Sequence, residues 1–140
     1  MSFNNIYEVS SSALNAQTIR MNAISSNLAN VDSIAGSREE AYKPLKPVFA
    51  AQYNKSLAKM EQASVPVQVA DIVEIDSLVE GRFEPENPLA DKDGYVYYSG
   101  INVVNEMADM MSATRSFEAN AEVINNVKSM QQSLLRVWEL

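Results

Sequence analysis

The chain has 140 residues, 18 acidic and 11 basic side chains, a formal net charge of −7, and neither histidine nor cysteine. Without those two residue types it can form no disulfide, no thiolate nucleophile, no histidine-based catalytic pair and no common zinc site. Its lysines and arginines form no phosphate-neutralising cluster, which disfavours nucleic acid and anionic membranes as partners. We therefore expect a single domain that is not an enzyme and uses no cofactor or metal.

Residues 1–33 carry an apolar stripe with helical periodicity. Its members alternate steps of four and three residues, the spacing of a heptad seam, although two of them are polar. They are Phe3, Tyr7, Ser10, Leu14, Gln17, Met21, Ile24, Leu28 and Val31. Because no proline or glycine occurs before Gly36, we predict one long helix. It is either a core helix of a bundle or a coiled-coil element that pairs with another chain.

The tetrapeptide Asn27-Leu28-Ala29-Asn30 stands at the predicted end of this helix. Asn30 can adopt the left-handed conformation and serve as a C-cap. Asn27 lies beside the seam residue Leu28, and we expect it to hydrogen-bond a neighbouring backbone. A helix stop explains Asn30 fully but Asn27 only in part, which makes the tetrapeptide a candidate functional motif.

Residues 34–101 contain all five prolines and all four glycines, which indicates a separate, β-rich and irregular middle module. The stretch 65–75 predicts a β-branched strand, and 95–98 predicts a second one after the turn Asp93-Gly94. The residues expected on one face of the first strand are Val67, Val69, Val73 and Ile75. The stretch 48–51 is ambiguous.

The middle module also concentrates the carboxylates. Residues 91–94 (Asp-Lys-Asp-Gly) have part of the composition of a calcium loop, but the glycine comes too early, so a turn is the stronger interpretation. Five further carboxylates could hold a hard cation. Because they are spread along an extended segment, a solvated face is the better prediction. They are Glu74, Asp76, Glu80, Glu84 and Glu86.

Residues 102–140 repeat the helical pattern, with Asn102 as the predicted N-cap. The stripe comprises Val103, Met107, Met110, Thr114, Phe117, Ala121 and Ile124, and then drifts to Val127, Gln131, Leu134 and Trp138. Two long apolar stripes must bury against something, and the simplest partner for each helix is the other. We predict a mainly α fold whose terminal helices pair as a coiled-coil-like bundle around a small β-rich middle module.

At several of these residues the chain resembles the flagellar rod, hook and hook-filament protein family. The residues similar to the N-terminal signature of the family are Leu14, Gln17, Arg20 and the stretch 27–30. Those similar to its C-terminal signature are Glu106, Met107 and the stretch 115–120. Residues 83–91 and 94–96, together with the chain length, resemble the short proximal-rod members. Residues 34–64 match weakly, Phe117 replaces a usual tyrosine, and Asn87 replaces a common histidine.

The resemblance implies a structural subunit of the proximal rod of the flagellar basal body. Such a subunit is exported unfolded by the flagellar type III apparatus and assembles helically in the periplasm with copies of itself and other rod proteins. Its helices would line the inner tube of a rod that carries torque and encloses the export channel. The first seven residues lack the basic and apolar regions of a cleaved signal. No stretch reaches the ~20 apolar residues of a membrane span.

We expect the assembly interface to follow the two helices. The candidate residues are Leu14, Gln17, Arg20, Met21, Ile24, Asn27, Leu28, Asn30, Glu106, Met107, Met110, Arg115, Phe117, Asn120, Ile124, Val127 and Leu134. The alternative is a soluble coiled-coil adaptor or chaperone, which would use the same stripes. That alternative gives no reason for the tetrapeptide 27–30 or for the stretch 83–96.

Overall fold

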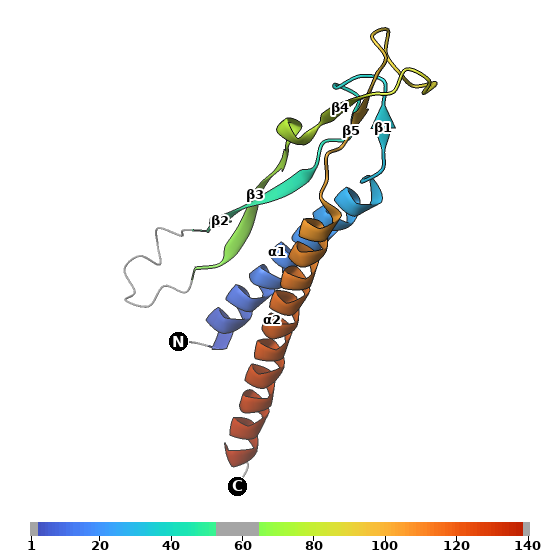
Figure 1. The fold of residues 1–140 in the computed structure, drawn as a ribbon. Helices are drawn as coiled ribbons and strands as arrows, with labels where there is room; N and C mark the ends of the chain where they lie inside the picture. The colour runs from blue at the N-terminus through green and yellow to red at the C-terminus, as the bar shows by residue number, and fades with distance from the viewer. Residues whose placement is uncertain (1–2, 53–64, 139–140) are drawn as a thin grey trace.

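A computed structural model describes residues 3–52 and 65–138 of the chain. Two long helices stand at the ends of the sequence, and short strands lie between them (Figure 1). The elements are α1 (Phe3–Ala29), β1 (Ile34–Ala35), β2 (Leu45–Ala51), β3 (Val67–Glu74), a 3₁₀ helix (Asp76–Leu78), β4 (Glu80–Phe83), β5 (Tyr95–Tyr98) and α2 (Val103–Trp138). The predicted order of helix, β-containing middle and helix is confirmed. The predicted division into modules 1–33, 34–101 and 102–140 stays a proposal.

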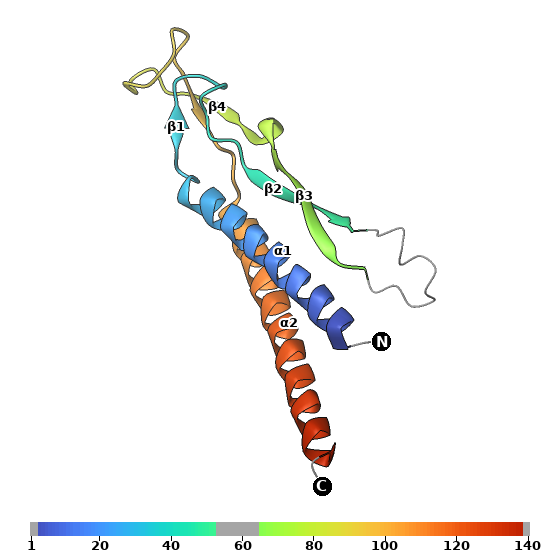
Figure 2. The same cartoon turned by 180° about the vertical axis from the view of Figure 1, so that it is seen from behind.

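The helices α1 and α2 pack side by side and run antiparallel, and α2 extends past the start of α1 (Figures 1 and 2). Asn102 caps α2 as predicted: its side-chain oxygen accepts the Asn105 N–H at 3.1 Å, and its carbonyl accepts the Glu106 N–H at 3.0 Å. Neither helix is long and apolar enough to cross a membrane, within the residues that the structure describes. Helical propensity alone does not stabilise such elements, so their order depends on the faces that they bury.

The end of α1 differs from the prediction for Asn30. Within the described chain only glycines have positive φ, so Asn30 does not adopt the left-handed conformation. Instead its Nδ2 amide reaches back and donates to the carbonyl of Ser26 at 2.8 Å, while its backbone N–H donates to the carbonyl of Asn27. A side-chain amide thus satisfies a carbonyl of the last turn without the steric cost of the left-handed region.

Strands β2 and β3 form an antiparallel ribbon that lies along α1 (Figure 2). The register shifts between Val48 and Phe49, where Val48 pairs with Asp71 but Phe49 pairs with Val69, so Ala70 is the extra residue of a β-bulge. A bulge reverses the alternation of side chains, so Val73 no longer shares a face with Val69. The prediction of a single face from 67 to 75 was therefore wrong, although the strand itself is confirmed.

A second sheet contains three short strands in the order β1-β5-β4, all antiparallel. The predicted strand 95–98 is its central strand, β5, and Val96 is fully buried there. Two strands of this sheet, β1 and β4, were not predicted, because they are short and one of them holds a glycine. The loop 84–94 joins β4 to β5 and forms the tip of the molecule farthest from the helix ends (Figure 1).

The sheet connects to the helices by two neighbouring segments that are tied together. The hydroxyl of Ser99, which is fully buried, donates to the carbonyl of Val31 at 3.0 Å. Gly100 follows with a φ of 62°, and a side chain there would collide with the carbonyl oxygen of Leu78. Glycine is required at this corner because the backbone passes so closely and turns into the left-handed region.

Candidate assembly interface

Asn27 lies where the last turn of α1, the start of β2 and the start of α2 converge. Its side chain is only 1% exposed, yet every polar atom of its carboxamide has a partner. The Nδ2 amide donates to the carbonyl of Leu45 at 3.0 Å and to Glu106 Oε2 at 3.2 Å. Oδ1 accepts the N–H of Leu45 at 2.8 Å and the hydroxyl of Tyr42 at 3.1 Å. The carboxamide of Asn27 thus satisfies both the N–H and the C=O of Leu45, as a paired strand would. The prediction that Asn27 hydrogen-bonds a neighbouring backbone is confirmed.

Glu106 brings α2 into the same network, and it is 8% exposed. Its carboxylate lies in the first turn of α2, where the helix dipole favours negative charge. The hydrogen bond from Asn27 offsets part of the cost of burying that charge. Asn27 belongs to the N-terminal signature and Glu106 to the C-terminal one, so the fold places the two signatures in direct contact. We call Asn27, Tyr42, Leu45 and Glu106 the junction.

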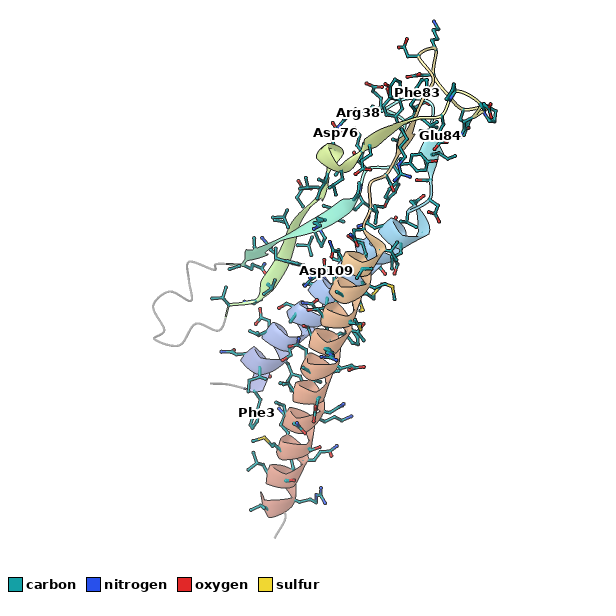
Figure 3. The ribbon with its side chains drawn as sticks, viewed as in Figure 1. Phe3, Arg38, Asp76, Phe83, Glu84 and Asp109 are labelled. Carbon is teal, nitrogen blue, oxygen red and sulfur yellow. The ribbon has the colours of Figure 1, made fainter. Side chains whose placement is uncertain are left out.

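Polar contacts continue from the junction along the helix pair. An ion pair joins Arg20 to Asp109 at 2.9 Å. Asp109 is labelled in Figure 3. Both side chains are partly exposed, so the pair contributes modestly to stability. Near the other end of α1 the hydroxyl of Tyr7 donates to Gln131 Oε1 at 3.1 Å. These contacts fix the register of the two helices over almost the whole length of α1.

The face of α2 that meets α1 keeps a heptad spacing but differs from the predicted stripe. Its covered positions include Glu106, Met110, Ala113, Phe117, Asn120, Ile124, Val127 and Gln131. Val103 and Met107, which begin the predicted stripe, are instead exposed. The start of the seam contains small or polar residues: Ala113 is fully buried, and Glu106 accepts a hydrogen bond from Asn27. The apolar pattern therefore predicted the wrong face of α2 for its first two turns.

The structure distributes the predicted interface residues over three environments. The buried ones are Ile24, Asn27, Glu106 and Val127. The half-buried ones are Leu14, Gln17, Arg20, Met21, Leu28, Asn30, Met110, Phe117, Asn120 and Ile124. The exposed ones are Met107, Arg115 and Leu134. The side chain of Trp138 lies outside the described residues. Buried Gln17 Oε1 has no hydrogen-bond donor within the described part of the chain.

Several residues of the site were missed by the sequence analysis. Tyr42 and Leu45 come from a stretch with no clear pattern, and only their position opposite Asn27 gives them a role. Ala16 and Ala23 are buried on α1 and are spaced one heptad apart, a signal of close packing that was available in the sequence. Asp109 pairs with Arg20 across the helices, which no local pattern could indicate.

A groove of about 380 Å³ lies where α1, α2 and β2 meet. Its walls combine apolar side chains with charges of both signs. They comprise Arg20, Ile24, Leu45, Lys46, Pro47, Phe49, Glu106 and Asp109. In the described ranges 3–52 and 65–138, no three acidic, histidine or cysteine side chains are grouped to hold a metal ion. The groove is thus lined by all three segments that meet at the junction.

The loop 84–94 at the tip is ordered by two carboxylates. Asp91 accepts backbone N–H groups of Tyr95 at 2.8 Å and Asp93 at 2.9 Å, which lowers the pKa of its carboxyl. Hydrogen bonds from Asn87 and Tyr98 likewise lower the pKa of Glu84. The preferred interpretation of residues 91–94 as a turn is confirmed, with Gly94 at a φ of 83°.

The other acidic side chains of the middle module are dispersed. Glu74, Glu80 and Glu86 are exposed, and exposed Asp76 pairs with Lys43 at 3.4 Å and with Arg38 at 4.0 Å. Figure 3 shows Arg38 and Asp76 beside each other, away from Glu84. These carboxylates therefore form a solvated surface with local ion pairs rather than one converging site.

Comparison with known proteins bears on both ends of this arrangement. Residues 8–34 match the family described as "Flagella basal body rod protein", and residues 92–137 match "Flagellar basal body rod FlgEFG protein C-terminal". The chain is also 42% identical over 139 residues to the flagellar basal-body rod protein FlgC of Salmonella typhimurium, covering 99% of this chain and all of that protein. The chain belongs to the FlgC family of flagellar basal-body rod proteins.

Other members of the FlgC family match over nearly the same length. The chain is 44% identical over 139 residues to FlgC of Escherichia coli O157:H7. The match covers 99% of this chain and all of that protein. With FlgC of Aquifex aeolicus it is 37% over 135 residues, or 96% of each chain. The resemblance inferred from the signatures in α1 and α2 is thus confirmed. The matched segments 8–34 and 92–137 contain Asn27 and Glu106, one of the residue pairs that join the helices in this FlgC-like rod protein.

Proposed function

We propose that the chain is a structural subunit of the proximal rod of the flagellar basal body, where it assembles helically with copies of itself and with other rod proteins. The observation that carries the proposal is the full-length similarity to FlgC proteins, combined with a junction that holds both helical signatures together in one chain. The assembled rod carries torque toward the hook and encloses the export channel.

In this proposal the helices of modules 1–33 and 102–140 pair in the manner of a coiled coil and form the inner layer of the rod. The antiparallel contact of α1 with α2 supports this arrangement. Module 34–101 faces outward, in keeping with its exposed carboxylates. The interface residues of both helices, from Leu14 to Leu134, contact neighbouring subunits where they are exposed and hold the helix pair together where they are buried.

Export by the flagellar type III apparatus without signal cleavage is part of the proposal and has its own test. Mass spectrometry of the subunit from assembled basal bodies should find a chain that has not been trimmed by signal cleavage. A form shortened by roughly 20 residues, the size of a secretory signal, would contradict uncleaved export.

The location is tested by electron microscopy of purified basal bodies in which this chain carries a label. The label is expected on the rod, between the membrane-embedded base and the hook. A soluble coiled-coil adaptor or chaperone, the alternative function, would stay in the soluble fraction and form a closed dimer. Sedimentation at rising concentration separates the two functions as well, because a rod subunit associates without a fixed endpoint.

A further inference from the structure

The sheet β1-β5-β4 has one covered face and one open face. On the covered face, Val96 is fully buried. On the other face, Phe83 and Tyr95 lie directly opposite each other and are 64% and 43% exposed. Tyr97, two residues farther along β5, lies on this same face and is half-buried. We call Phe83, Tyr95 and Tyr97 the aromatic surface, and Figure 3 shows Phe83 at the tip end of the molecule.

The exposed rings are held in fixed positions. Phe83 and Tyr95 meet edge to face, with ring centroids 5.4 Å apart. The ring of Phe83 also lies over Gly94, where an added side chain would approach its Cε2 atom to 2.9 Å. Gly81 is paired with Tyr97 across the strands and leaves that side of the Tyr97 ring uncovered. An aromatic side chain that is already ordered loses little conformational entropy when a partner covers it, which favours a binding role.

Carboxylates surround the aromatic surface. Asp91 accepts the hydroxyl of Tyr97 at 3.3 Å. Burial raises the pKa of Tyr97, and the negative charges of Asp91, Glu39 and Asp93 raise it further. Within residues 3–52 and 65–138, none of these three carboxylates belongs to an ion pair. The loop 84–94 contains four acids and one base, a formal charge of −3, so this end of the sheet attracts cations.

The opposite face of the same sheet already binds a cation to an aromatic ring. The guanidinium carbon of Arg82 lies 4.4 Å from the centroid of the Tyr98 ring, within the range of a cation–π contact. In the described part of the chain, no lysine or arginine occupies the same position over Phe83, Tyr95 or Tyr97. The aromatic surface thus combines ring faces with unpaired negative charge, and its cation would come from another molecule.

We propose that the aromatic surface binds a lysine or arginine side chain on an extended segment of a different protein. The cationic head stacks on Phe83 and Tyr95 and is attracted by the neighbouring carboxylates. Because β4 is an edge strand, the backbone groups on its outer side can pair with an extended segment. A second copy is the poorer electrostatic partner, since every copy has a formal charge of −7. This contact goes beyond the proposed function and stands without it.

Titration of the purified full chain tests the cation directly. The probe is a short capped peptide that alternates serine and arginine, and its matched control carries citrulline, which has nearly the same shape but no charge. The nuclear magnetic resonance signals of Tyr95 and Tyr97 should shift as the arginine peptide is added. The citrulline peptide should bind about tenfold more weakly. Equal binding of the two peptides would overturn the proposal.

Ring and charge variants locate the binding of the arginine peptide. Phe83→Leu keeps an apolar side chain but removes the ring, and it should weaken binding several-fold. Its control is Phe49→Leu, which removes a 40% exposed ring of β2 and should leave binding unchanged. Unchanged binding by the Phe83 variant, or equal weakening by both, contradicts the assignment of the surface.

The charge variants decide the question if Phe83→Leu does not fold. Asp93→Asn removes one exposed carboxylate beside the aromatic surface, and Glu122→Gln removes one from an exposed position on α2. Only the Asp93 variant should weaken binding of the arginine peptide. Equal weakening by both would show that the peptide responds to the net charge of the chain alone, and the proposal would fail.

A photocrosslinker at the same position identifies the class of partner in cells. The full chain carries p-benzoylphenylalanine in place of Phe83, and mass spectrometry identifies the peptides that it captures. We expect peptides of a different protein with a lysine or arginine at or next to the crosslinked residue. A crosslink to a second copy, a captured segment without a basic residue, or the absence of any crosslink would each refute the proposed partner.

Discussion

Polar residues are usually exposed and apolar residues buried, but the junction and the far end of α2 show the opposite distribution. At the junction an amide and a carboxylate are buried, with Asn27 at 1% and Glu106 at 8% exposure. At the far end of α2, Leu134 and Val137 stand in solvent. Buried polar groups specify one geometry because only one arrangement satisfies them, whereas exposed apolar groups gain stability from whatever covers them. The single chain thus fixes the geometry of the junction but leaves apolar side chains at the far end of α2 uncovered.

The largest expected effect comes from removing the junction. Asn27→Ala leaves both backbone groups of Leu45 and the Glu106 carboxylate without this partner, and we expect a loss of about 3–5 kcal/mol of unfolding free energy. Urea unfolding followed by circular dichroism measures it. Asn22→Ala, an exposed asparagine on the same helix, is the control and should change stability by less than about 0.5 kcal/mol. Equal effects of the two variants would refute the role of the junction.

The seam between the helices should be next in magnitude. Leu28→Ala or Phe117→Ala removes a half-buried side chain, and we expect each to cost about 2–3 kcal/mol, the lower part of the range for large-to-small changes. Because every subunit of a polymer repeats the loss, motility should be abolished while the protein is still made. Swimming assays with immunoblots of cell and basal-body fractions measure this. Normal rods in either variant would show that the seam tolerates the change.

Hydrogen exchange of the dilute monomer compares the stability of the two helices with that of the middle module. We expect residues 1–31 and 103–140 to show low protection relative to the middle module, because a helix pair with wet outer faces is marginal before assembly. Within α2 the amides of 123–138 should exchange fastest, since this end exposes the most apolar surface. Protection in both helices as strong as in the sheets would contradict the view that neighbours complete them.

The tip should respond to acid, in contrast to the helix ends, which lack such carboxylate networks in the described residues. Hydrogen bonds to Asp91 and Glu84 lower the pKa of both carboxyls. A lowered folded-state pKa stabilises the loop above the ordinary values of 3.8 and 4.5, and that stabilisation is lost as the pH falls through the folded values. Amide resonances of Asp93 and Tyr95 should therefore shift below pH 4, about the ordinary carboxyl value. In Asp91→Asn the transition at Asp93 should be reduced; an unchanged transition would exclude Asp91 as its source.

The smallest effect is expected for the acidic surface. Glu80 is exposed and lies 3.9 Å from Arg82, an ion pair between two solvated side chains. Such pairs contribute about 0–1 kcal/mol, so Glu80→Ala should leave both stability and swimming near normal. Loss of motility in that variant would place Glu80 at a contact that the single chain does not show.

The sequence predicted the two helices, the N-cap Asn102 and the strand 95–98, because local periodicity and capping chemistry determine them. It did not predict that Ala70 forms a bulge, because a one-residue change of register depends on the partner strand. Asn30 was assigned the wrong conformation because a side-chain hydrogen bond can replace a left-handed cap. The bulge depends on a strand distant in the sequence, whereas the contact of Asn30 is local and joins it to Ser26, four residues earlier.

The sequence predicted several residues of the candidate site, but not the contacts between them. Asn27 and Glu106 were both identified, but a pairing between residues 79 positions apart in the sequence leaves no trace in either neighbourhood. Met107 was assigned to the helix seam because methionine is apolar, yet it faces outward. An apolar pattern indicates which residues favour burial, but it does not identify the segment or chain that buries them.

The cross-tie between Ser99 and Val31 has a mechanical consequence. The sheet is joined to the helices by two chain segments, and each one alone would bend like a single tether. The hydrogen bond between them, with Gly100 fitted under the carbonyl of Leu78, makes the two segments act as one short, double-stranded strut. A sideways load on the sheet therefore passes to α1 and α2 through both segments together.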